Sequence, residues 1–142
     1  MSPLATALAA EQAAVYLFGV LGARATDPGL TADLRTAYQE HADARDALTD
    51  EIRAAGATPP GPAVAYAVPS SWHGDAALRA GAIDVQRRCT AAYVTAVGRA
   101  AGDDRRTLAT GAGTSAAREV ALGAGVTALP GLRGKSLRRP AT

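Results

Sequence analysis

The sequence predicts an all-α protein built from four long helices. Alanine supplies 36 of the 142 residues and aromatic residues only 4%, a composition that favours closely packed helices over strands. Apolar residues recur at helical spacing in four stretches, which two short connections and one long proline-rich segment separate. The length of the chain fits one domain with a single core.

The first helix is expected from about Pro3, a favourable first-turn residue after a Ser2 cap, to the turn at residues 25–29. Its seam has the 4-3-4-3-4 spacing of a helix that packs along its whole length: Leu4, Leu8, Glu11, Val15, Phe18 and Gly22. Glu11 interrupts this apolar stripe, so we expect its carboxylate to be buried. Because an unpaired buried charge costs several kcal/mol, Glu11 must find a cation, a metal or a proton.

The second helix is expected from about Leu30 to Ala55, and it ends at Gly56. Its seam positions are Leu34, Tyr38, His41, Arg45, Leu48, Ile52 and Ala55. Residues 56–74 hold four prolines and cannot be helical. The third helix is expected over about 75–101 and the fourth over about 103–122, each with an aspartate near its start.

The lengths of the connections predict the topology. The short first turn forces the first two helices to be antiparallel, whereas the proline-rich segment is far longer than a hairpin needs. About 17 residues near polyproline geometry reach about 53 Å, enough to return along a helix about 37 Å long. We therefore expect a ferritin-like four-helix bundle, two antiparallel hairpins joined by a long Pro-rich crossover between the second and third helices. Residues 1–126 form this domain and residues 127–142 a basic C-terminal tail.

This topology places polar residues of different helices at one height. Antiparallel neighbours should have residue numbers that sum to about 55 in the first hairpin and about 205 in the second. We expect a buried polar layer at mid-bundle formed by Glu11, His41, Arg45, Gln86 and Glu119. Cys89 should lie beside it, and the guanidinium of Arg45 should pair with Glu11.

Five stretches of the chain resemble a known family when taken in order. They are EQAAVYLFG (11–19), HADARDAL (41–48), GATPP (56–60), AYAVP (65–69) and TALPGL (127–132). Together, over nearly the whole chain, they resemble a bacterial ferritin-like domain family of unassigned function. The resemblance implies the fold, and it carries no substrate or activity with it.

A di-iron or di-manganese centre of this architecture needs a Glu from two helices and Glu-x-x-His from the other two. The sequence departs from that set, because Tyr38 stands three residues before His41 and Leu122 three residues after Glu119. The ligands that remain for iron or manganese are Glu11, His41 and Glu119. A buried hydrogen-bond and ion-pair network that fixes helix register is therefore the favoured interpretation.

Charge and cysteine content narrow the possible partners. Without the four basic residues of the last ten (Arg133, Lys135, Arg138 and Arg139) the formal net charge of +2 becomes −2. The globular part therefore offers no basic face for nucleic acid. Cys89 is the only cysteine, which excludes an internal disulfide and favours a reducing, cytoplasmic location. The apolar run at 13–23 is short and lacks a basic flank, so we expect neither membrane association nor a cleaved signal.

We expect a non-catalytic bundle that acts as an interaction or small-ligand-holding module without a cofactor. Its alanine-faced helices would leave apolar surface for a second copy, which predicts a homodimer. The alternative is a redox protein that binds iron or manganese through the reduced ligand set. The tyrosines are expected to fill the core, with the lining of a pocket as the alternative: Tyr16, Tyr38, Tyr66 and Tyr93.

Overall fold

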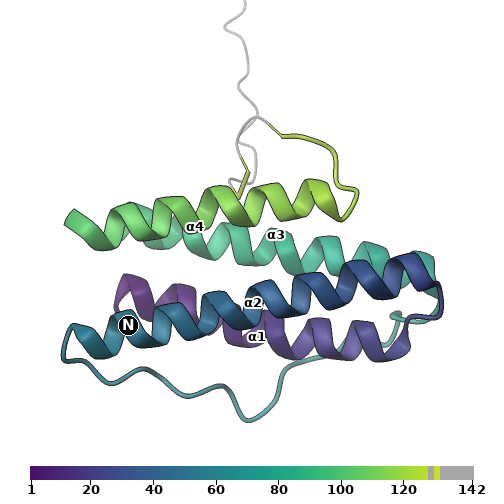
Figure 1. Ribbon diagram of the computed structural model, residues 1–142, viewed down its shortest axis with the longest axis horizontal. Coiled ribbons are helices and arrows are strands. Elements are labelled where there is room, and N and C mark those ends of the chain that lie inside the picture. Colours follow the sequence, from purple (N-terminus) through teal and green to yellow (C-terminus); the bar gives the residue numbers. More distant parts are fainter. Residues whose placement is uncertain (128–129, 132–142) are drawn as a thin grey trace, which may run out of the picture.

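Four helices make up the computed structural model, which describes residues 1–127 and 130–131 and has no strand among them. The helices are α1 (Pro3–Arg24), α2 (Pro28–Ala54), α3 (Asp75–Arg99) and α4 (Gly102–Ala121), as Figure 1 shows. The prediction of an all-α protein with four helices is confirmed. Most of the predicted basic tail, residues 128–129 and 132–142, lies outside the described residues.

The caps explain where the first two helices begin. Ser2 Oγ accepts a hydrogen bond from the backbone N–H of Ala5 at 3.1 Å, and proline occupies the first turn, as predicted. The side chain of Asp27 accepts in the same way from the N–H of Leu30 at 2.8 Å. Helix α2 therefore starts at Pro28, earlier than the predicted Leu30, because Asp27 is its N-cap and the proline needs no partner for an N–H.

Contacts near the helix ends define the helix directions. Arg99, at the end of α3, donates to the carbonyl of Met1 at 3.2 Å, so α3 runs antiparallel to α1. Arg79, near the start of α3, pairs with Asp33, near the start of α2, at 3.2 Å, so α2 and α3 run in the same direction. In Figure 1 α1 and α2 form one pair and α3 and α4 the other.

The segment between α2 and α3, residues 55–74, runs along the bundle (Figure 1). The amide of Gln12 donates to the carbonyl of Pro60 at 2.8 Å, which ties the segment to α1. Near its end Trp72 is buried against α3, where a Cβ added to Gly81 would lie 2.6 Å from the indole nitrogen. The absence of a side chain at Gly81 is therefore what admits the indole.

Polar side chains divide the hydrophobic core into two clusters. One cluster lies towards the end of α1 and the start of α2 and includes Phe18, Leu21, Leu34, Trp72, Leu78 and Val85. The other lies towards the start of α1 and the end of α2 and includes Leu4, Leu8, Leu48, Ile52, Tyr93 and Leu108. The site described below occupies the level between them.

Within the described part of the chain, one helix, α1, is long and apolar enough to cross a membrane by length and composition alone. It has 22 residues, and its most apolar window has a mean hydropathy of 1.5. Half of that window is buried inside the bundle, and the helix lies near the N-terminus; both a buried core helix and a signal sequence pass the same test.

Candidate functional site

Glu11 and His41 form the centre of the site, and both side chains are fully buried. Oε2 of Glu11 lies 2.5 Å from Nδ1 of His41, and Oε1 accepts a hydrogen bond from the hydroxyl of Tyr93 at 2.8 Å. The imidazole stacks on the ring of Phe18, with 4.9 Å between the ring centroids. Both carboxylate oxygens therefore have a partner, and the imidazole is held in position on one face.

The hydrogen bonds continue from His41 into the second helix pair. Nε2 of His41 lies 2.9 Å from Oε1 of Gln86, and the Gln86 amide donates to Ser115 Oγ at 2.7 Å. The hydroxyls of Ser115 and Thr90 are 2.9 Å apart, and Thr90 also donates to the backbone carbonyl of Gln86 at 3.1 Å. We call this connected set, which draws on all four helices, the polar network: Glu11, His41, Gln86, Thr90, Tyr93 and Ser115.

The directions of these hydrogen bonds indicate which nitrogen of His41 donates to Gln86. Because Thr90 donates to a carbonyl, the hydroxyl of Ser115 donates to Thr90 and accepts from the Gln86 amide. The side-chain carbonyl of Gln86 then accepts from a protonated Nε2 of His41. Nδ1 forms its hydrogen bond with Oε2 of Glu11, and with a single proton between these two atoms the pair carries no net charge, which avoids an uncompensated buried charge.

Cys89 is buried next to the polar network. Burial, and then the neighbouring charge of Glu11, raise the pKa of its thiol well above the ordinary value, which keeps it protonated. Burial and Glu11 raise the pKa of Tyr93 in the same way, so Tyr93 remains a hydroxyl donor. The ligating atoms of Glu11, His41 and Cys89 all lie within 4.8 Å of one another, a set of O, N and S donors that could hold Zn²⁺.

The structure brings three of the five predicted layer residues together: Glu11, His41 and Gln86. The prediction that Arg45 pairs with Glu11 is wrong. The Arg45 side chain is 35% exposed and its Nε donates to Asp46 Oδ1 at 2.8 Å. This hydrogen bond raises the pKa of Arg45 and lowers that of Asp46. The long side chain reaches water and keeps its hydration there, while Glu11 is satisfied by donors that need no net buried charge.

Glu119 is buried but lies apart from the polar network. Its Oε2 is 3.7 Å from Nε of Arg87, and its Oε1 has no hydrogen-bond partner among the residues the structure describes. The predicted ligand set of Glu11, His41 and Glu119 is therefore not assembled. The reason is a shift of one helical turn, because Ser115 rather than Glu119 lies opposite Gln86.

Three members of the polar network were not predicted from the sequence: Thr90, Tyr93 and Ser115. A signal for the first two was present, because Gln86, Thr90 and Tyr93 follow one another at spacings of four and three. Residues at this spacing share one face of a helix. Ser115 offers no comparable signal, since small residues surround it in α4.

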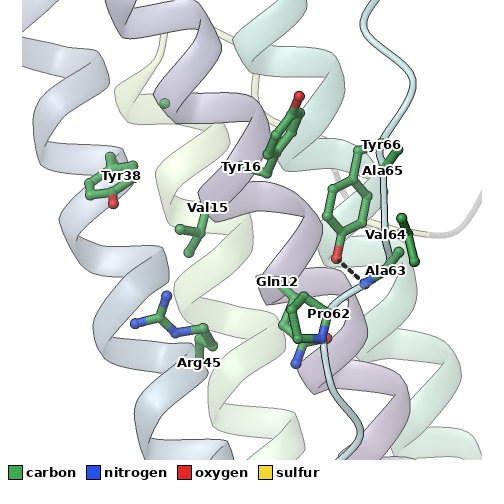
Figure 2. A pocket seen from close by; sticks show the side chains of 11 residues that line it. Gln12, Val15, Tyr16, Tyr38, Arg45, Pro62, Ala63, Val64, Ala65 and Tyr66 are labelled. Atoms are coloured by element: carbon green, nitrogen blue, oxygen red, sulfur yellow. Dashed lines mark hydrogen bonds between the residues drawn. The ribbon is translucent and has the colours of Figure 1, made fainter.

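A surface cleft of about 580 Å³ lies between α1, α2 and residues 62–66 (Figure 2). The side chains that matter most in its lining are Gln12, Tyr16, Tyr38, Arg45 and Tyr66. We call this feature the aromatic cleft. Three of the four tyrosines thus line a pocket, and Tyr93 is the one buried in the core, so the expectation that all four fill the core is wrong.

Comparison with known proteins agrees with the fold and adds no activity. The family model described as "Domain of unknown function (DUF4439)" matches residues 3–134. A crystal structure of a conserved hypothetical protein, rv2844, from Mycobacterium tuberculosis is similar, with 27% sequence identity and a TM-score of 0.76. The match covers 84% of this chain and 91% of that one. No curated protein matches the chain.

Proposed function

Because the chain belongs to the DUF4439 family of domains of unknown function, we propose a function from its own residues. The protein is a non-catalytic, ferritin-like helical bundle that holds a small ligand or partner at its surface. Its buried polar network sets the register of the four helices. The homodimer and the cytoplasmic location stay predictions, and light scattering of the purified protein tests the first of them.

The directions of the helices support the ferritin-like part of the proposal. Two antiparallel pairs with α2 and α3 in the same direction need a connection that spans the length of the bundle. Residues 55–74 have that length and are anchored to α1 by Gln12 and to α3 by Trp72. We therefore infer that the proline-rich segment is the crossover between α2 and α3.

One observation supports the proposal that the protein is non-catalytic: every side-chain polar group of the polar network has a hydrogen-bond partner. Within the described residues, the buried side-chain atoms without a hydrogen-bond partner are Nε of Arg118 and Oε1 of Glu119, and neither belongs to the network. A general base or a metal ligand must present a lone pair to a substrate or an ion. Glu11 and His41 instead direct their polar atoms at each other and at buried neighbours.

The complete pairing of the polar network favours a structural role, in which the network fixes the register of the four helices. Each helix contributes at least one member, so sliding any helix by one residue would leave buried donors or acceptors unmatched. Buried polar groups are known to select one register among several at some cost in stability.

Elemental analysis of the purified protein tests this proposal. We expect far less than one equivalent of iron, manganese or zinc in the wild-type protein and in Glu11→Gln, with the helical circular dichroism unchanged. A stoichiometric metal in the wild-type protein that is lost in Glu11→Gln would contradict it.

A metal-binding protein is the second candidate, favoured by the proximity of Glu11, His41 and Cys89. Oxygen, nitrogen and sulfur donors in this number suit Zn²⁺ better than the iron or manganese expected from the sequence. Binding would require the Cys89 thiol to lose its proton and the Glu11–His41 hydrogen bond to open. The candidate predicts that added Zn²⁺ raises the melting temperature of the wild-type protein and not that of Cys89→Ala. An unchanged wild-type melting temperature rejects it.

A further inference from the structure

We propose that the aromatic cleft binds a small aromatic carboxylate, a planar apolar ring that carries one carboxylate group. This inference rests on the proposed ligand-holding function and names the chemical class of the ligand. The volume of the cleft, about 580 Å³, falls within the range of about 300–1,000 Å³ that is typical of small-molecule sites.

Flat aromatic surfaces form two sides of the cleft. Tyr16 and Tyr66 lie against each other with 5.3 Å between their ring centroids, and Tyr38 lies apart from them on α2 (Figure 2). Tyr16 is 46% exposed and Tyr38 40% exposed, so ring surface of both remains uncovered. A planar ring bound in the cleft would bury part of this exposed ring surface.

Among the described residues that line the cleft, Arg45 is the one charged residue, and it is a cation. Among the described residues it forms a hydrogen bond only through Nε, to Asp46. The two terminal nitrogens of the guanidinium remain available to donate. A carboxylate fits this planar group through two parallel hydrogen bonds, which an uncharged ring substituent cannot reproduce.

Gly19 leaves open space in the wall between the tyrosines. It is exposed in the interior of α1, where glycine is less favourable than alanine. A Cβ added there would meet nothing nearer than Cε2 of Tyr38, at 3.7 Å, which is an ordinary contact distance. Packing therefore does not require glycine at this position, whereas a large side chain would occupy the cleft.

The test is a titration of the isotope-labelled full chain with 2-naphthoate, followed by amide chemical shifts in NMR spectra. The uncharged 2-naphthamide serves as the matched probe. We expect shifts concentrated on residues 12–19, 38–45 and 62–66, with naphthamide binding about tenfold more weakly. Arg45→Gln should bind 2-naphthoate more weakly by about the same factor. Arg45→Lys, which keeps the charge without the planar group, should lose less affinity.

Two glycine variants provide the steric control. Gly19→Leu should abolish the shifts, whereas Gly22→Leu, one turn further along α1 with no atom within 4 Å of its added Cβ, should leave them unchanged. Melting curves establish that each variant is folded. Equal binding of naphthoate and naphthamide, equal binding by Arg45→Gln, or no shifts in the cleft at millimolar naphthoate would each overturn the proposal.

The two proposals can fail separately. Stoichiometric metal bound by the polar network would contradict the non-catalytic function and leave the naphthoate result standing. A metal-free protein that does not bind naphthoate would overturn the cleft alone.

Discussion

The polar network and the aromatic cleft use neighbouring residues in opposite ways. His41 and Arg45 are one turn apart on α2, and Glu11 and Gln12 are adjacent on α1, yet one of each pair faces the core and the other faces the cleft. Inside, the charge of Glu11 is matched by two donors and is inaccessible to solvent. At the surface, Arg45 uses one donor and keeps the others available. Burial requires complete pairing, whereas exposure permits a group to remain available for binding.

Glu11→Ala should be the most damaging change, because it leaves His41 and Tyr93 without an acceptor in the core. Removing one partner from a buried pair costs about 3–5 kcal/mol. Chemical denaturation monitored by circular dichroism should show this loss in the free energy of unfolding.

Glu11→Gln is the matched control for that variant. Its amide can donate to Nδ1 of a neutral His41 while its carbonyl accepts from Tyr93, so each polar atom keeps a partner. We expect a loss of about 1 kcal/mol. Equal losses for the two substitutions would show that the pairing described here does not stabilise the network.

Gly111→Ala should have the next largest effect, because a Cβ there would lie 2.4 Å from Cε1 of Tyr93. The ring cannot move away without weakening its hydrogen bond to Glu11. We expect a loss of about 1–3 kcal/mol in the free energy of unfolding. Gly113→Ala, on the same helix with open space around its Cβ, should instead stabilise by up to about 1 kcal/mol. A stable Gly111→Ala protein would mean that the Tyr93 ring is not held in place.

The four helices could be predicted because signals close to each helix end determine where the helix begins and ends. The Ser2 cap, the proline at the first turn of α1 and the prolines of residues 56–74 each act within a few residues of where they stand. The predicted start of α2 at Leu30 is late, because an aspartate before a proline fits a turn and is also a good N-cap, and Asp27 is the N-cap here.

The site could be predicted only in part, because it depends on the register between helices. Glu11 and His41 are predictable because each stands on the seam of its helix, which is a property of a single helix. The position of Glu119 depends on the height of α4 to within one turn, and α4 lies one turn away from the predicted height, so that Ser115 is opposite Gln86. The position of Arg45 depended on where its long side chain ends, which the positions of Cα atoms on a seam do not determine.

Alanine substitutions at two glycines of α1 test whether the wall of the aromatic cleft is open, in contrast to the closely packed polar network. Gly19→Ala and Gly22→Ala should each raise the free energy of unfolding by up to about 1 kcal/mol, because alanine is the better helix former and both sites have room for Cβ. Thermal denaturation measures both. Destabilisation by Gly19→Ala alone would show that the cleft wall is tightly packed rather than open.

Asp75 is a paired carboxylate at the surface, so it shows how much hydrogen bonds stabilise the fold without burial. Of the substitutions discussed, Asp75→Asn should change the stability least. Its carboxylate accepts from the N–H and hydroxyl of Thr26 at 2.8 and 2.7 Å and from the N–H of Asp27 at 3.1 Å, but it lies at the surface. These hydrogen bonds lower its pKa. A lowered pKa in the folded state means that the stabilisation is present above the unfolded value of about 3.9 and is lost as the pH falls through the folded value.

The melting temperature of Asp75→Asn should therefore lie below that of the wild-type protein at neutral pH, and the difference should close in acid. Asp84→Asn, whose carboxylate faces Arg88 at 3.5 Å in solvent, provides the control. If the Asp75→Asn difference persisted in acid, the protonated acid would be retaining the bonds. If Asp75→Asn destabilised the protein at neutral pH as much as Glu11→Ala does, the number of hydrogen bonds rather than burial would determine how much a paired carboxylate stabilises this fold.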